Sequence, residues 1–199
     1  MRPTEKWLVL ASASPRRREL LTLLGHRFDV IPADLDESVL GSEDARTYVE
    51  RLARAKALAV ATQRRDVVVV AADTTVALDG EIMTKPVDAP DAARMLRLLS
   101  DRTHDVHTGL AVFDPAHSGG EPLTSTVVTT KVTFDSLTDA DVAFYVSTGE
   151  PLDKAGAYAI QGIGAMYVRA VHGSVTNVVG LPLAELRALL GDALRTRPD

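Results

Sequence analysis

Two hydroxyl groups and three guanidinium groups lie close together in the segment Ser-Ala-Ser-Pro-Arg-Arg-Arg, which spans residues 12–18. Ser14 followed by Pro15 is typical of the start of a helix. The free N–H groups and positive dipole end of such a helix attract anions, and guanidinium groups suit phosphate oxygens. The segment therefore predicts a phosphate site. A second interpretation stays open, in which the segment is a solvated basic turn and Ser14 only caps the helix.

A second group of candidate residues is acidic. Asp73 and Thr74 follow the apolar run 67–72, which we expect to be an interior strand. Open α/β sheets place ligand crevices at strand carboxyl ends, so Asp73 could hold a metal ion or accept a proton; alternatively, it starts a turn and caps a backbone group. Asp36 and Glu37, on an expected loop, suit Mg²⁺ or Mn²⁺ when substrate phosphates complete the shell. Taken alone, they are an ordinary solvated pair.

Lysine and amide side chains form a third group. Lys56, Lys85 and Lys154 each lie beside an expected turn or on a polar helix face, where a surface lysine is the simplest interpretation. The amide of Gln161 could read the edge of a base, or the residue could simply belong to a turn. The sequence lacks a Gly-x-x-x-x-Gly-Lys-Ser/Thr loop, and its five histidines lack metal-ligand spacing, so we assign the histidines no catalytic role.

Composition limits the class of protein. The 199 residues carry 22 Lys and Arg against 27 Asp and Glu, a net charge of -5, which argues against binding to polymeric nucleic acid or to anionic membranes. Any basic site must be local. The chain has no cysteine, and its first apolar run, residues 7–11, is too short for a signal peptide or a membrane span, so we expect a cytoplasmic protein.

Hydrophobic periodicity predicts the elements that position these residues. We expect strands over 7–11, 67–72, 106–113, 124–134 and 165–171, and helices over 14–24, 42–61, 91–99, 138–147 and 182–194. Asp79-Gly80 predicts a hairpin turn between 76–78 and 81–83, and the strands near 106–113 and 124–134 should pair antiparallel. No linker or repeat divides the chain. These features predict a mixed α/β protein with a single domain over 1–199.

Several segments together resemble the Maf family. They are residues 12–21 (SASPRRRELL), 72–76 (ADTTV), 85–86 (KP), 104–109, 149–162 (GEPLDKAGAYAIQG) and 177–183 (NVVGLPL). The segments occur in the family's order over nearly the whole chain. One departure is Asp101, where the family usually has glycine at a turn, and we expect it to affect local geometry only.

The resemblance implies a fold similar to inosine triphosphate pyrophosphatases, with an elongated twisted sheet, flanking helices and two lobes around a cleft. It implies a nucleoside triphosphate pyrophosphatase that uses a divalent cation, Mg²⁺ or else Mn²⁺ or Co²⁺, and forms a homodimer. By this analogy Asp73 is the proton acceptor or metal ligand, and Glu37 helps to hold the cation. Residues gripping the triphosphate would be Ser12, Ser14, Arg17, Lys56 and Lys85.

The family contains two branches that differ at three positions. One branch prefers dTTP and UTP, including modified forms, and the other prefers 7-methyl-GTP. Arg16, Thr74 and Gln161 resemble the dTTP/UTP branch at all three positions. The alternatives are a 7-methyl-GTP or ITP pyrophosphatase, a nucleotide-binding regulator of cell division without turnover, and a structural α/β domain whose basic turn has no function.

Overall fold

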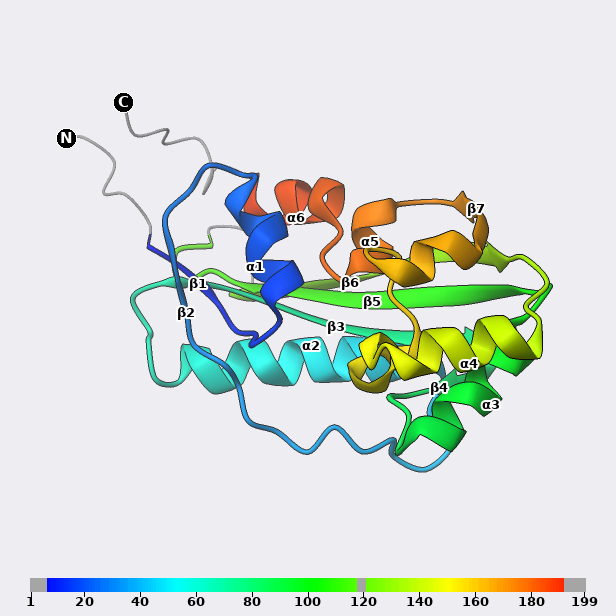
Figure 1. The fold of residues 1–199 in the computed structure, drawn as a ribbon. Coiled ribbons are helices and arrows are strands. Elements are labelled where there is room, and N and C mark those ends of the chain that lie inside the picture. Colours follow the sequence, from blue (N-terminus) through cyan, green and yellow to red (C-terminus); the bar gives the residue numbers. More distant parts are fainter. Residues whose placement is uncertain (1–6, 118–120, 192–199) are drawn as a thin grey trace.

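The computed structural model describes residues 7–117 and 121–191. Within these ranges seven strands form one sheet with the order β2-β1-β3-β5-β6-β7, and β4 pairs with β3 beside this path. The strands are β1 (Leu8–Leu10), β2 (Phe28–Val30), β3 (Val68–Leu78), β4 (Glu81–Met83), β5 (Thr103–Phe113), β6 (Leu123–Phe134) and β7 (Val168–His172). β1 is parallel to β2 and β3, whereas the other pairs are antiparallel. The long strands β3, β5 and β6 run along the molecule (Figure 1).

Helices cover both faces of the sheet. They are α1 (Pro15–Thr22), α2 (Ala45–Ala61), α3 (Ala89–Leu99), α4 (Asp139–Ser147), α5 (Val175–Val179) and α6 (Leu183–Leu190), with 3₁₀ helices at Glu150–Asp153, Ala155–Ala157 and Ile163–Tyr167. Side chains alternate along β3, so that Val68, Val70 and Ala72 pack with α1 and α6, while Val69 and Ala71 pack against α2. At the other end of the sheet α3 and α4 cover the core around Val76. The expected mixed α/β fold is confirmed.

The strand that carries Asp73 is longer than the sequence indicated. β3 continues to Leu78, so Asp73 and Thr74 lie in its middle and do not end it, and the interpretation of Asp73 as the start of a turn is wrong. Pairing with β5, from Val69 opposite Phe113 onward, keeps these polar residues in the strand.

An opening lies along one edge of β3, because its neighbours on that side are short. β1 pairs with β3 only as far as Leu10 opposite Val70, and β4 pairs from Val76 onward. The edge of β3 between these two partners contains Asp73 and Thr74, whose side chains point to opposite faces. The crevice expected at a strand's carboxyl end is therefore at the end of β1, not of β3.

Helix α2 lies unusually close to the sheet, at Gly109 of β5. A Cβ atom built on Gly109 would lie 2.2 Å from the carbonyl oxygen of Val49. Only glycine permits this approach, because any side chain would overlap the helix backbone. The close packing fixes α2, and with it Lys56, over the middle of β3.

Most expected elements are confirmed. Asp79 and Gly80 have positive φ and join β3 to β4, and Thr138 begins α4 with a complete capping box. Asp101, with a φ of 53°, lies in a turn. β2 and α5 were not expected, a 3₁₀ helix replaces the first part of the strand expected over 165–171, and the end of the helix expected over 182–194 lies outside the described residues. No helix in the described ranges is long and apolar enough to cross a membrane.

Candidate active site

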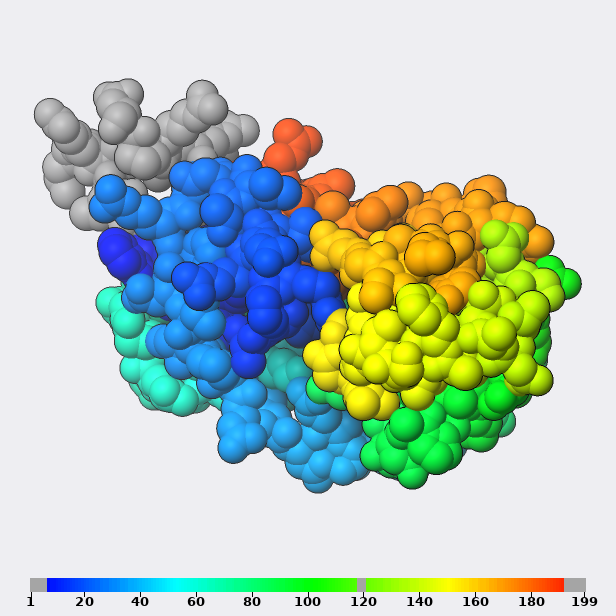
Figure 2. Space-filling model, viewed as in Figure 1, coloured from blue at the N-terminus to red at the C-terminus, as the bar shows by residue number. Residues whose placement is uncertain are grey.

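A cleft of about 770 Å³ opens at this edge of β3. It separates the N-terminal segment, blue in Figure 2, from the yellow segment that follows residue 150. The ten residues that the family resemblance linked to the site line it: Ser12, Ser14, Arg16, Arg17, Glu37, Lys56, Asp73, Thr74, Lys85 and Gln161; Asp36, the other member of the acidic pair, does not. Five basic side chains and three acidic ones border this space in an otherwise acidic protein, so the cleft has a local excess of positive charge, which favours an anionic ligand.

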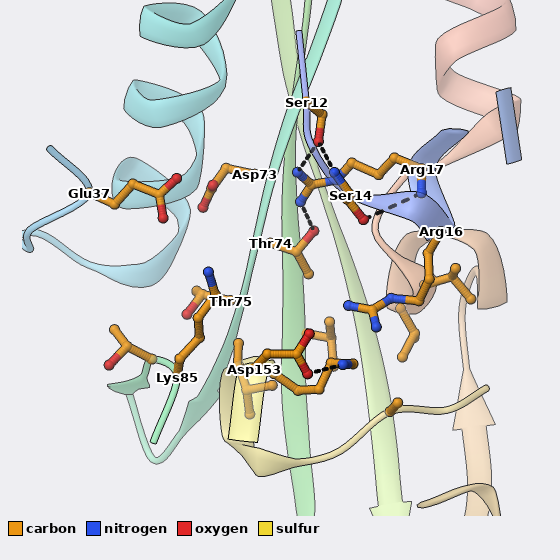
Figure 3. Close-up of a pocket in the computed structure, with 18 of the residues that line it drawn as sticks. Ser12, Ser14, Arg16, Arg17, Glu37, Asp73, Thr74, Thr75, Lys85 and Asp153 are labelled. Carbon is orange, nitrogen blue, oxygen red and sulfur yellow. Dashed lines mark hydrogen bonds and ion pairs between the residues drawn. The ribbon is translucent and has the colours of Figure 1, made fainter. Parts of the chain in front are cut away.

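Two carboxylates meet at one ammonium group on the α2 side of the cleft. Nζ of Lys56 lies 2.6 Å from Oδ1 of Asp73 and 2.6 Å from Oε1 of Glu37. Lys56 and Asp73 are buried, whereas the Glu37 side chain is 44% exposed. Figure 3 shows the Glu37 and Asp73 carboxylates pointing toward each other, with the ammonium group of Lys85 directed at the same space.

The loop that carries Glu37 is anchored to α2. The hydroxyl of Tyr48 donates a hydrogen bond of 2.9 Å to the Glu37 backbone carbonyl, and burial raises the pKa of Tyr48 to about 12. Burial alone would raise the pKa of Glu37, but the hydrogen bond and charge of Lys56, with the charges of Lys85 and Arg17, hold that pKa below its usual value. Glu37 is therefore ionised at neutral pH.

Arg17 is fixed by three hydrogen bonds on the opposite side of β3. Its guanidinium group donates to the Gly180 carbonyl at 2.8 Å, to Oγ of Ser12 at 3.2 Å and to Oγ1 of Thr74 at 3.1 Å. Burial lowers the pKa of Arg17 and the charge of Asp73 opposes that effect, yet an arginine keeps its proton at neutral pH. These contacts hold a permanent positive charge at the cleft.

The Arg17 contacts continue into the core through two residues that the sequence did not single out as site residues. Oγ1 of Thr74 lies 2.9 Å from Oγ1 of Thr108, which donates to the Asn177 carbonyl at 2.9 Å. Thr108 belongs to the segment 104–109 and Asn177 to the segment 177–183, both of which supported the family resemblance, but neither residue was given a role. A buried hydroxyl on a neighbouring strand is visible only once the pairing of β3 with β5 is known.

The start of α1 has the capping geometry expected from Ser14. The Arg17 backbone N–H donates to Oγ of Ser14 at 3.5 Å, and the Ser14 N–H donates to Oγ of Ser12 at 3.2 Å. The expected N-cap at Ser14 is thus confirmed, and it does not exclude a phosphate site, because Ser12, Ser14 and Arg16 all border the cleft. Both serines and Arg16 are drawn in Figure 3.

The far wall of the cleft comes from the segment after α4. Lys154 contacts the Asp153 carboxylate, and the charge of Arg16 helps to lower the pKa of Asp153 against the opposing effect of burial. Gln161 is exposed and makes no hydrogen bond with the described part of the chain. Its amide is free to bind a ligand.

The acidic side of the cleft has a donor set that suits a divalent cation completed by substrate. No group of three or more His, Asp or Glu side chains that could hold a metal ion occurs in residues 7–117 and 121–191. Glu37 and Asp73 nevertheless face one space, and each uses only one carboxylate oxygen for Lys56. Mg²⁺ commonly binds through one or two carboxylates plus substrate phosphates, so these two residues fit such an ion.

Comparison with known proteins identifies the family of this chain. Residues 7–193 match the family described as Maf-like protein. A dTTP/UTP pyrophosphatase of Anaeromyxobacter dehalogenans (strain 2CP-C) is 59% identical over 183 residues, which are 92% of either chain, and one of Escherichia coli O157:H7 is 51% identical over 96% of either chain. The Staphylococcus aureus Ham1 protein shares the fold with a TM-score of 0.52 at 18% identity, over 93% of this chain and 98% of that one. The chain belongs to the family of Maf-like proteins.

Proposed function

We propose that this protein hydrolyses dTTP and UTP, and modified forms of them, to the nucleoside monophosphate and pyrophosphate. The observation that carries the proposal is that Glu37, Lys56 and Asp73 face the same cleft as Arg17, so a carboxylate pair and a cationic phosphate site share one ligand space. Relatives at 51–59% identity are named dTTP/UTP pyrophosphatase. The proposal treats 1–199 as a single Maf-like domain, because one sheet extends through the described ranges.

The triphosphate would lie across the opening at the edge of β3. Arg17 offers its fixed guanidinium group, Lys85 is exposed at the cleft, and the hydroxyls of Ser12 and Ser14 lie at the mouth of α1. Lys56 would complete the grip from α2. Positive groups at this edge would also stabilise the charge that moves onto the departing pyrophosphate.

Glu37 and Asp73 would hold a divalent cation, Mg²⁺ or else Mn²⁺ or Co²⁺, together with oxygens of the substrate. When bound, such an ion withdraws charge from the phosphoryl oxygens and lowers the pKa of coordinated water. The Glu37 carboxylate is ready for this purpose, because its cationic neighbours hold its pKa below the usual value.

The chemical step is attack of water on the α-phosphorus. A new oxygen–phosphorus bond forms, the bond from the α-phosphorus to the bridging oxygen breaks, and pyrophosphate leaves with the bonding electrons. Asp73 would orient the water and accept its proton, a role supported by its burial at the open edge of β3. Lys56, with its Nζ 2.6 Å from Oδ1, would fix the orientation of the Asp73 carboxylate.

Base recognition would come from the other side of the cleft. Gln161 offers a free donor and acceptor, Arg16 faces the same space, and Thr74 acts through its hydrogen bond to Arg17. As parts of the same proposal, the protein acts in the cytoplasm as a homodimer, on free nucleotides and neither on polymeric nucleic acid nor at a membrane.

The test is release of pyrophosphate by purified protein with Mg²⁺ from UTP, dTTP, CTP, 7-methyl-GTP, ITP and ATP, with Asp73→Asn as the blank. Turnover of UTP and dTTP that is absent from the variant would support the proposal. Preference for 7-methyl-GTP or ITP would instead support the corresponding pyrophosphatase. Nucleotide binding without turnover across the panel would overturn the enzymatic proposal in favour of a nucleotide-binding regulator.

A further inference from the structure

Two side chains that do not line the cleft, Glu150 and Tyr145, form hydrogen bonds with the loop that carries Gln161. Glu150, at the start of a 3₁₀ helix, accepts a hydrogen bond of 3.0 Å from the N–H of Ile163 through Oε2 and one of 3.0 Å from the N–H of Gly164 through Oε1. The hydroxyl of Tyr145 on α4 donates to the same Oε1 at 2.7 Å.

Tyr145 also holds the other end of the loop. The N–H of Ala159 donates to the Tyr145 hydroxyl at 3.1 Å. The Tyr145 hydroxyl therefore links Ala159, which precedes Gln161, to the Glu150 carboxylate. The result is a continuous chain of hydrogen bonds from Ala159 through Tyr145 and Glu150 to Gly164. Both ends of the loop are fixed, while Gln161 itself has no partner in the described ranges.

The loop is pressed against these two side chains with no space between them. A Cβ atom at Gly162 would lie 2.4 Å from Oε2 of Glu150, and one at Gly164 would lie 2.4 Å from the Tyr145 hydroxyl. Gly162 also has a φ of 117°, which side-chain-bearing residues rarely adopt. Gly162 and Gly164 therefore allow the loop backbone to pack in direct contact with the Glu150 carboxylate and the Tyr145 hydroxyl.

The charge state of Glu150 suits a side chain that accepts several hydrogen bonds. Burial alone would raise its pKa, but the N–H groups of Gly164 and Ile163, the hydroxyl of Tyr145 and the charge of Lys154 lower the pKa below its usual value. An ionised carboxylate only accepts hydrogen bonds, and all three neighbours donate. A neutral amide in its place would turn a donor toward at least one of them.

We infer that Glu150, with Tyr145, is a positioning residue that presents the Gln161 amide to the nucleobase and so contributes to base recognition. The inference rests on the proposed function for the place of the base. Pre-organisation of this kind preserves affinity, because a ligand does not have to order the loop when it binds. Neither Glu150 nor Tyr145 lines the cleft, so their effect on a base would pass through the loop.

The test compares two ligands that differ in the nucleoside. Calorimetry gives the affinity of the full chain, with Mg²⁺, for α,β-methylene-UTP and for inorganic tripolyphosphate. Glu150→Gln is expected to weaken binding of the UTP analogue about fivefold, the equivalent of one neutral hydrogen bond, and to leave tripolyphosphate unchanged. Gln161→Ala should have the same effect, and adding Glu150→Gln to Gln161→Ala should cause no further loss.

Two further variants separate positioning from a general loss of structure. Tyr145→Phe removes the bridging hydroxyl while keeping the ring, and is expected to act as Glu150→Gln does. Asp141→Asn weakens the capping box of α4 without touching residues 159–164, and should leave both affinities unchanged.

Equal weakening for both ligands, or a full further loss in the Gln161→Ala background, would overturn the inference. Wild-type binding of the analogue without any turnover of UTP would overturn the proposed function alone, because the positioning role is measured by affinity.

Discussion

Lys56 and Asp73 form an ion pair in which both side chains are almost fully buried, with 2.6 Å between Nζ and Oδ1. The same ammonium group lies 2.6 Å from Oε1 of Glu37, so one lysine compensates two carboxylates. The Lys56 ammonium group lies beside the two carboxylates that would also bind a divalent cation. Lys56 and a bound metal ion are therefore expected to be energetically coupled.

Lys56→Met is expected to destabilise the metal-free protein and to make it respond more strongly to Mg²⁺. The substitution leaves Asp73 buried without a partner, which lowers the free energy of unfolding by about 3 kcal/mol by comparison with other buried pairs. Hydration of Glu37, whose side chain is 44% exposed, offsets part of this loss. Thermal unfolding with and without Mg²⁺ measures the effect. Lys131→Met removes an exposed ion pair with Asp105 and serves as the control. The same Mg²⁺-dependent stabilisation in Lys56→Met as in wild type would contradict the coupling.

Asp73→Asn is expected to lower turnover roughly 10²- to 10⁴-fold, because an amide cannot accept the proton of the attacking water. The fold should persist, since Lys56 keeps its contact with Glu37 and β3 keeps its pairing with β5. Single-turnover rates and thermal unfolding of the same sample check both parts. A variant that retains more than about a tenth of the wild-type rate would exclude the assigned role.

Arg17→Lys is expected to lower kcat/KM for UTP roughly 10- to 100-fold, the range for loss of one charge-assisted hydrogen bond. Lysine keeps the charge but cannot reach the Gly180 carbonyl, Ser12 and Thr74 with one planar group. Arg18→Lys, one residue further along α1 and exposed, is the matched control. Steady-state kinetics of the two variants measure the effect. Equal losses of kcat/KM would contradict the role assigned to the Arg17 guanidinium group.

The structure brings the ten predicted site residues to one cleft, but the sequence did not predict the contacts among them. Capping and turn signals are local, which is why α1, α4 and the turn at Asp79 were found from residue types alone. The sequence predicts too short a β3 because Asp73, a residue type that is depleted in strands, follows its apolar half, and pairing with β5 keeps Asp73 within the strand. The five residues of α5 are too few to show a helical period.

Contacts between distant residues could not be predicted from spacing. Lys56 and Asp73 are joined by the placement of α2, which depends on Gly109 in a strand that comes later in the chain. Arg17 meets Gly180 from the other end of the sequence. A family resemblance can point to such residues, but only the fold gives the physical reason that they meet.

Gly109→Ala is expected to lower stability by about 3 kcal/mol, because the new methyl group would overlap the carbonyl of Val49 and force α2 off the sheet. Gly80→Ala is the comparison: its φ is 86° and nothing lies within 4 Å of a new Cβ, so only backbone strain of about 1 kcal/mol applies. Denaturant unfolding measures both. A cost for Gly109→Ala no larger than that for Gly80→Ala would mean that α2 can shift freely.

The acid sensitivity of the fold should depend on His104. Burial lowers the pKa of His104 from 6.5 to about 4, and its Nε2 lies 2.8 Å from the Tyr158 hydroxyl. The unfolded chain takes up a proton there below pH 6.5 while the folded protein does not, so the stability contributed by neutral His104 is lost as pH falls from 6.5 toward 4. In His104→Gln, stability is expected to fall about 3 kcal/mol less over that window than in wild type. Urea unfolding at several pH values checks this, with the exposed His117→Gln as control, and parallel pH profiles for His104→Gln and wild type would contradict it.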